Sequence, residues 1–221
     1  MQRLFDIFFS FIAIVLLSPI LIFTCIVLRF TGEGEVFYIQ IRVGQYGKPI
    51  KIFKFATMLK NSPNIGTGTV TLNGDPRILP VGKFLRKSKI NEIPQILNVL
   101  WGNMSLIGPR PQTKRCFNAF PENLQDTIVS VKPGLSGVGS IWFRNEELML
   151  NEADNSDELY DRIIMPYKGK LEEWYVLNKS INLYFILILA TIITVIFGKI
   201  PFRNSFLSEI PSCPNNLMDY F

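Results

Sequence analysis

Two charged residues stand where the chain is stiff, and both are suited to act on phosphate. Arg110 lies between Pro109 and Pro111, and Glu92 lies two residues before Pro94. A guanidinium on a stiff backbone suits two-point phosphate binding, and a carboxylate at a helix break can face a cleft. Further positive charge upstream comes from Arg42, Lys54, Arg77 and Arg86. These residues are candidates for an anion-binding site, with a solvated or salt-bridged surface as the alternative.

The 221-residue chain contains no histidine, and this removes several catalytic chemistries. Neither a Ser-His-Asp nor a Cys-His mechanism is available, so acid–base work falls to carboxylates, lysines or tyrosines. Cys25, Cys116 and Cys213 are widely spaced and predict neither a disulfide framework nor a metal cluster. A metal ion here must therefore be a hard cation held by oxygen atoms, for which Mg²⁺ is the best match.

Charge is unevenly distributed along the chain. Residues 31–90 hold ten Lys or Arg against three acids, a balance of +7, whereas residues 131–180 hold six against nine, a balance of −3. A basic half beside an acidic half indicates an anionic partner, which is a phosphorylated substrate, an anionic lipid or nucleic acid. No nucleic-acid-binding module is recognisable, so we expect no nucleic acid.

Two uncharged runs predict membrane contact. Residues 7–28 carry no charge over 22 positions, about 33 Å of helix, which is enough to cross a hydrocarbon core. The run is too long for a cleaved signal peptide. Ser18-Pro19 lies near its centre, where proline kinks or breaks a helix. We favour a re-entrant helix that enters and leaves on the cytoplasmic side, with a kinked spanning helix as the alternative.

The second uncharged run covers residues 180–198, about 28 Å if helical. Its alternatives are a spanning helix, a helix at the membrane interface and a packed helix, and its low polarity favours spanning. The tail from residue 205 has prolines and polar residues and predicts loose structure.

The middle of the chain predicts an α+β domain. Residues 36–58 alternate apolar and polar side chains around a Gly-Lys-Pro turn, which predicts a short β-hairpin. Residues 60–76 predict a loop, 81–101 predict two short helices interrupted by Pro94, 102–111 predict a turn, a strand and a turn, and 146–179 predict helix. We divide the chain into a membrane helix (1–30), a compact cytoplasmic or interfacial catalytic domain (31–180), and a C-terminal hydrophobic helix with its tail (181–221).

One stretch carries a family resemblance. NEIPQILNVLWGNMSLIGPRP, residues 91–111, resembles the core signature of the bacterial sugar transferases, the monotopic polyprenyl-phosphate phosphoglycosyl transferases. The resemblance covers roughly residues 1–190 and includes, in the family's order, Gln40-x-Arg42-x-Gly44, Phe53-Lys54-Phe55-x-Thr57-Met58, Asp75-Pro76-Arg77, Gly82-Lys83-Phe84-Leu85-Arg86, Lys132-Pro133-Gly134-x-x-Gly137 and Trp174-Tyr175.

The resemblance implies transfer of a phosphosugar from a UDP-sugar to a polyprenyl phosphate, giving a polyprenyl diphosphosugar and UMP. It implies a site at the cytoplasmic face of the bacterial inner membrane, with Mg²⁺ bound close to Glu92 and Arg110 as a phosphate contact. The segment around Gly134 and Gly137 is then expected to help hold the nucleotide. Assembly into a homo-oligomer is left open.

The sequence departs from the family pattern at the residue expected to attack phosphorus. The family's Asp-Glu pair is Asn91-Glu92 here, and an amide is a poor nucleophile. Three interpretations follow: Glu92 or another carboxylate takes the nucleophile's role, the transfer is direct, or the chain is a catalytically silent binding or scaffold relative. Glu146 and Glu147 are further candidates to supply oxygen atoms to a metal ion.

Overall fold

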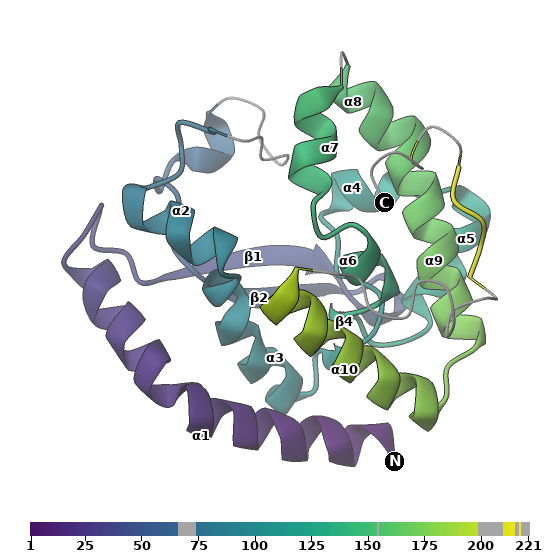
Figure 1. Ribbon diagram of the computed structural model, residues 1–221, viewed down its shortest axis with the longest axis horizontal. Coiled ribbons are helices and arrows are strands. Elements are labelled where there is room, and N and C mark those ends of the chain that lie inside the picture. The colour runs from purple at the N-terminus through teal and green to yellow at the C-terminus, as the bar shows by residue number, and fades with distance from the viewer. Residues whose placement is uncertain (66–73, 154, 199–209, 215–216, 218–221) are drawn as a thin grey trace.

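A computed structural model describes residues 1–65, 74–153, 155–198, 210–214 and 217. It is a mixed helix and strand fold with a long apolar N-terminal helix, which confirms the predicted combination of both element types (Figure 1). Most of the buried apolar side chains form one large cluster in the second half of the chain, and two smaller clusters lie under the first half.

The predicted β-hairpin is present as strands β1 (Phe37–Val43) and β2 (Pro49–Phe55), which pair antiparallel. The turn between them contains Gly47 at φ +72°, a conformation that glycine adopts without strain. Arg42 pairs with Ile50 and Lys54 pairs with Tyr38. Because side chains alternate along a strand, this register puts Arg42 and Lys54 on the same face of the hairpin.

The predicted pair of short helices is confirmed, with a 3-10 helix between them. Helix α2 (Pro80–Lys87) is followed by the 3-10 helix η3 (Ile90–Gln95), which contains Pro94, and by α3 (Ile96–Trp101). The turn into η3 is made by Lys89 in the left-handed region at φ +60°. Asn98 of α3 then accepts a hydrogen bond from the Phe53 amide and donates one to the Lys51 carbonyl, which fastens α3 and η3 to β2.

The second half wraps helices around a short parallel strand pair. Strand β3 (Ser105–Ile107) pairs with β4 (Gly134–Ser136). The helices are α4 (Lys114–Asn118), α5 (Glu122–Val129), α6 (Val138–Trp142), α7 (Glu146–Glu152), α8 (Ser156–Leu159), the π-helical turn η4 (Tyr160–Ile164) and α9 (Met165–Leu177). The strand in 105–107 and the helices in 146–177 confirm the sequence prediction. Helix α9 packs across α5 and α6, with Leu171 and Tyr175 fully buried.

The first uncharged run forms a single helix, α1 (Gln2–Arg29), which by length and composition alone is able to cross a membrane. Pro19 lies inside it, and Figure 1 shows α1 changing direction along its length and following the edge of the domain. At its first turn, Gln2 donates to the Ser105 hydroxyl and Arg3 donates to the Leu100 carbonyl. At its other end Leu28 is buried against the domain. Both ends of α1 therefore contact the same domain.

The second uncharged run forms α10 (Ile181–Phe197), which packs on the domain along one face. Its buried residues recur at helical spacing and are Leu183, Tyr184, Leu187, Ala190 and Thr194. The Tyr184 hydroxyl donates to the buried Asp6 carboxylate of α1, and Phe185 contacts the Phe5 ring edge-on. The opposite face is apolar and exposed, with Leu189, Ile192 and Ile196 on it, and the spanning of a membrane that the low polarity favoured stays a prediction. The predicted loose tail from residue 205 lies largely outside the described residues.

Candidate active site

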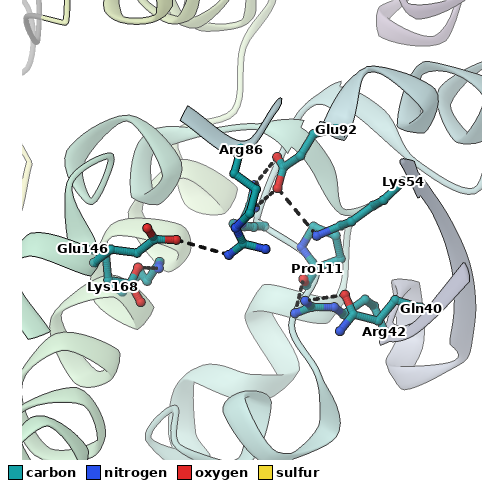
Figure 2. Close-up of polar contacts among 10 residues, drawn as sticks. Gln40, Arg42, Lys54, Arg86, Glu92, Pro111, Glu146 and Lys168 are labelled. Carbon is teal, nitrogen blue, oxygen red and sulfur yellow. Dashed lines mark hydrogen bonds and ion pairs between the residues drawn. The ribbon is translucent and has the colours of Figure 1, made fainter. Parts of the chain in front are cut away.

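Glu92 lies at the centre of a group of cations contributed by separate parts of the chain. Its carboxylate meets the Arg110 guanidinium at two points, with Nη2 to Oε1 at 2.6 Å and Nη1 to Oε2 at 3.2 Å. Lys54 Nζ lies 3.5 Å from Oε1. Glu92 lies in the 3-10 helix η3, and Lys54 lies in β2. Arg110 lies in the Pro-Arg-Pro segment, whose two prolines restrict the backbone. Figure 2 shows the Glu92 carboxylate and the Lys54 ammonium pointing into the same space.

The cations keep Glu92 ionised. Burial alone would raise its pKa, but Arg110, Lys54 and Lys89 outweigh burial and hold the pKa well below the ordinary range. Burial lowers the pKa of Lys54 to about 7. Glu92 acts to raise this pKa, whereas the neighbouring Arg42, Arg110 and Arg86 act to lower it further. Lys54 therefore loses its charge within the physiological pH range unless an added anion stabilises it.

Arg42 and Arg86 complete the cationic cluster, which we define as Arg42, Lys54, Arg86, Lys89 and Arg110. Arg42 Nη2 donates to the Gln40 amide oxygen at 2.7 Å, and its Nη1 donates to the Pro111 carbonyl at 3.4 Å (Figure 2). Arg86 Nη2 donates to Glu147 at 3.3 Å. Four of these five residues are candidates named from the sequence, and Lys89 is not among those candidates.

Three other candidates have structural roles. Arg77 is buried and forms an ion pair with Asp75 at 2.5 Å, and it also donates to the Ser62 and Ile65 carbonyls. Its guanidinium therefore holds a loop together, and its assignment as a phosphate contact stays a prediction.

The glycines expected to hold the nucleotide, Gly134 and Gly137, allow close backbone packing. A Cβ atom on Gly134 would lie 2.1 Å from the Gly108 nitrogen, and one on Gly137 would lie 2.2 Å from the Gly108 oxygen. Glycine is required at both positions to seat β4 and the following turn against the chain after β3. This packing is a structural role for both glycines, and their part in holding the nucleotide stays a prediction.

Asn91 directly precedes Glu92 in the chain, and it is buried, with 7% of its surface exposed. Its side-chain oxygen Oδ1 has no hydrogen-bond partner within the described part of the chain. A buried acceptor without a donor is uncommon in native proteins. Asn91 thus occupies the position of the expected nucleophile as a neutral and incompletely satisfied group.

The acidic side chains of the site do not fit a resident Mg²⁺ ion in this arrangement. Both oxygens of Glu92 already meet cations, Glu147 pairs with Arg86, and Glu146 forms a short ion pair with Lys168. Among the described residues, no group of three or more Cys, Asp or Glu is placed to hold a metal ion. We therefore derive no catalytic step through a metal bound by Glu92.

Sequence reasoning missed Glu172, which accepts a hydrogen bond from the Arg110 backbone amide at 3.2 Å. It also missed Asn98, which fixes η3 to the hairpin, and Asp6, which accepts from Ser105, Leu106 and Tyr184. The one signal in the sequence for Asp6 is its position as an acid at the start of an apolar run. For Glu172 the sequence holds no such signal, because it lies in an ordinary-looking helical stretch.

The fold and the site define a domain with an apolar N-terminal helix and a cationic cluster around one carboxylate. The sequence matches the model of the bacterial sugar transferase family over residues 1–198, and the chain belongs to that family.

Curated relatives agree with this assignment. The chain is 34% identical over 199 residues to a UDP-N-acetylgalactosamine-undecaprenyl-phosphate N-acetylgalactosaminephosphotransferase of Aeromonas hydrophila, an alignment that covers 89% of this chain and 44% of that protein. It is 38% identical over 144 residues to a UDP-glucose:undecaprenyl-phosphate glucose-1-phosphate transferase of Klebsiella pneumoniae, covering 63% of this chain and 30% of that protein. It is 34% identical over 180 residues to the uncharacterized sugar transferase EpsL of Bacillus subtilis, covering 81% and 79%. The chain thus spans less than half the length of the first two relatives.

Proposed function

We propose that the chain transfers a phosphosugar from a UDP-sugar to a polyprenyl phosphate. The bond between the two phosphates of the UDP-sugar breaks, the phosphosugar is joined to the oxygen of the lipid phosphate, and UMP leaves. The products are a polyprenyl diphosphosugar and UMP. Family membership supports the reaction class, and the names of the relatives support a UDP-sugar and an undecaprenyl phosphate as the substrates.

The observation that carries this proposal is the cationic cluster around Glu92. A diphosphate and a lipid phosphate together bring several negative charges to one place, and fixed cations stabilise charge that shifts between phosphate oxygens. Arg110 presents a planar fork of donors on a stiff backbone, a geometry that matches phosphate as well as carboxylate. Arg42, Lys54, Arg86 and Lys89 supply further charge.

We assign the essential carboxylate to Glu92. It is ionised at neutral pH and touches Arg110 and Lys54, which are the two groups best placed to receive phosphate. Substrate phosphate and Glu92 therefore compete for the same donors, so that phosphate binding frees carboxylate oxygen atoms beside the reacting group. Mg²⁺ is expected to accompany the diphosphate, because this ion is commonly held by substrate phosphates and water with one or two carboxylates.

The proposed location is the cytoplasmic face of the bacterial inner membrane, with α1 as a re-entrant anchor. Support comes from the two ends of α1, since Gln2 and Arg3 bond to the domain at one end and Leu28 packs on it at the other. A helix whose two ends contact one domain of this size is poorly suited to cross a bilayer. A lipid substrate also requires a site at the level of the headgroups.

The alternative is a catalytically silent relative that binds the substrates without turnover, and Asn91 favours it. Replacing Asn91 by Asp tests the alternative directly. Our proposal predicts less than a tenfold change in UMP release for Asn91→Asp, because Glu92 is the essential carboxylate. A gain of a hundredfold or more would support the silent relative.

The proposal is tested by UMP release from purified protein supplied with polyprenyl phosphate and a panel of UDP-sugars. We expect release with at least one UDP-sugar, dependent on the lipid phosphate and stimulated by Mg²⁺. No release across a broad panel would contradict the proposal.

A further inference from the structure

Glu172 of α9 is a fully buried carboxylate that contacts the segment carrying Arg110. Its side chain is 0% exposed, and Oε1 accepts a hydrogen bond from the Arg110 backbone amide at 3.2 Å. The carboxylate is held closely, because a Cβ atom on Gly139 would lie 2.5 Å from Oε1. Burial of a carboxylate costs free energy unless the carboxylate is paired, so a buried Glu172 indicates a specific role at this position.

The backbone of residues 109–111 supplies a specific reason. Pro109 and Pro111 have no amide hydrogen, so the Arg110 N–H is the one backbone donor of this tripeptide. Glu172 is its acceptor, while Arg42 donates to the Pro111 carbonyl. The Pro109 carbonyl also accepts a hydrogen bond from the Gly134 amide at 2.8 Å. The stiff segment is therefore held at the carbonyls of Pro109 and Pro111, and at the Arg110 amide between them.

Among the described residues, Glu172 has no ion-pair partner, and its hydrogen bond is made by one side-chain oxygen. Lys168, one turn earlier on α9, forms its ion pair with Glu146, and Glu172 Oε2 has no hydrogen-bond partner in the described ranges. Burial raises the pKa of Glu172 to about 7, although the Arg110 amide, Lys168 and the Arg110 guanidinium act against burial. Neutral and ionised forms therefore coexist near neutral pH, and each has an oxygen that can accept from the Arg110 amide.

We propose that Glu172 is a positioning residue, whose side-chain oxygen fixes the Arg110 backbone so that the guanidinium is aimed at the diphosphate of the substrate. The inference rests on the proposed function and deepens it. Glu172 acts through Arg110 and does not itself touch the substrate. The acidic second half of the chain thus orients a cation of the basic first half.

The test is UDP affinity, measured by calorimetry on the full-length protein in detergent. Glu172→Met removes the acceptor and leaves the Arg110 amide unpaired. We therefore expect the dissociation constant for UDP to rise about tenfold. Glu172→Gln keeps an oxygen of the same reach and is expected to stay within about threefold of wild type. Glu173→Gln, on the same helix but partly exposed, is the matched control and is expected to bind UDP as wild type does.

A double-mutant cycle separates positioning from a general loss of structure. If Glu172 acts through Arg110, the Glu172→Met change adds no further loss in an Arg110→Met background. An equal loss in both backgrounds, or unchanged affinity in Glu172→Met alone, would overturn the inference. If Glu172→Met does not fold, Glu172→Asp carries the test, because it keeps the charge but draws the oxygen away from the amide, and it should also weaken binding. Wild-type protein that binds no UDP would overturn the proposed function and this role together, an outcome distinct from failure of the inference alone.

Discussion

Arg110 and Glu92 meet in a two-point ion pair, with Arg110 Nη2 donating to Oε1 at 2.6 Å and Nη1 donating to Oε2 at 3.2 Å. The same two nitrogen atoms form the fork that would bind a phosphate. In this conformation the carboxylate takes the place of phosphate on the guanidinium, and Lys54 lies against the same oxygen. Under the proposed function, substrate binding is an exchange of anions at Arg110, so replacing either Arg110 or Glu92 should change binding or turnover measurably.

Replacing Arg110 by Lys keeps the charge but removes the planar fork. We expect the KM for the UDP-sugar to rise about tenfold with a smaller change in kcat, because a lysine ammonium offers one contact where the guanidinium offers two. Steady-state kinetics of UMP release measure both constants. Arg115→Lys, at a half-exposed arginine of α4, is the matched control and is expected to leave both constants unchanged. Unchanged KM in Arg110→Lys would remove Arg110 from phosphate binding.

The pKa of Lys54, lowered by burial to about 7, predicts a pH dependence of UDP binding. Protonated Lys54 binds phosphate more tightly than neutral Lys54, so affinity should fall as the pH rises through 7. We expect about a tenfold weaker affinity at pH 8.5 than at pH 6, which corresponds to a pKa raised by about one unit on binding. Calorimetry in buffers of different ionisation enthalpy should show proton uptake on binding at pH 8.

The variant Lys54→Arg checks the origin of this effect. Arginine stays protonated over the whole range, so the dependence should become flat. Lys51→Arg, at an exposed position on the same strand, should keep the wild-type slope. A wild-type slope in Lys54→Arg would assign the titration to another group.

Local pattern was sufficient to predict the hairpin and the neighbouring helices. The alternation of apolar and polar side chains around a Gly-Lys-Pro turn predicts both strands. The observed register then places Arg42 and Lys54 on one face of the hairpin. Pro94 likewise marks the place where the helical pattern changes, and the structure has a 3-10 helix there. These features depend on residues within one or two turns of each other, which is the range over which sequence pattern is informative.

Features made by distant residues could not be predicted in this way. Glu172 and Arg110 are 62 positions apart, and nothing in the sequence around Glu172 distinguishes it from a solvated helix residue. The uneven charge along the chain likewise does not reveal that Glu147 contacts Arg86 or that Glu172 contacts the Arg110 amide. The composition of α10 likewise does not reveal that Tyr184 and Leu187 pack on the domain.

The topology of α1 yields a separate prediction. A protease-cleavable tag placed before Met1 should lie on the same side of the membrane as a tag inserted at Lys48 in the exposed hairpin turn, because both ends of α1 contact the domain. Protease should therefore remove both tags from inverted membrane vesicles and neither from intact spheroplasts. Removal of the N-terminal tag alone from spheroplasts would establish a spanning helix.

The central claim is that Glu92 is the essential carboxylate of a phosphosugar transfer. The most direct measurement compares UMP release by wild-type protein and by Glu92→Gln, each supplied with polyprenyl phosphate, Mg²⁺ and the best UDP-sugar of the panel. Loss of the charge that balances Arg110 and Lys54 should reduce release about a hundredfold or more, while Glu122→Gln, at an exposed position on α5, should retain wild-type release. Release by Glu92→Gln at the wild-type rate would contradict the account.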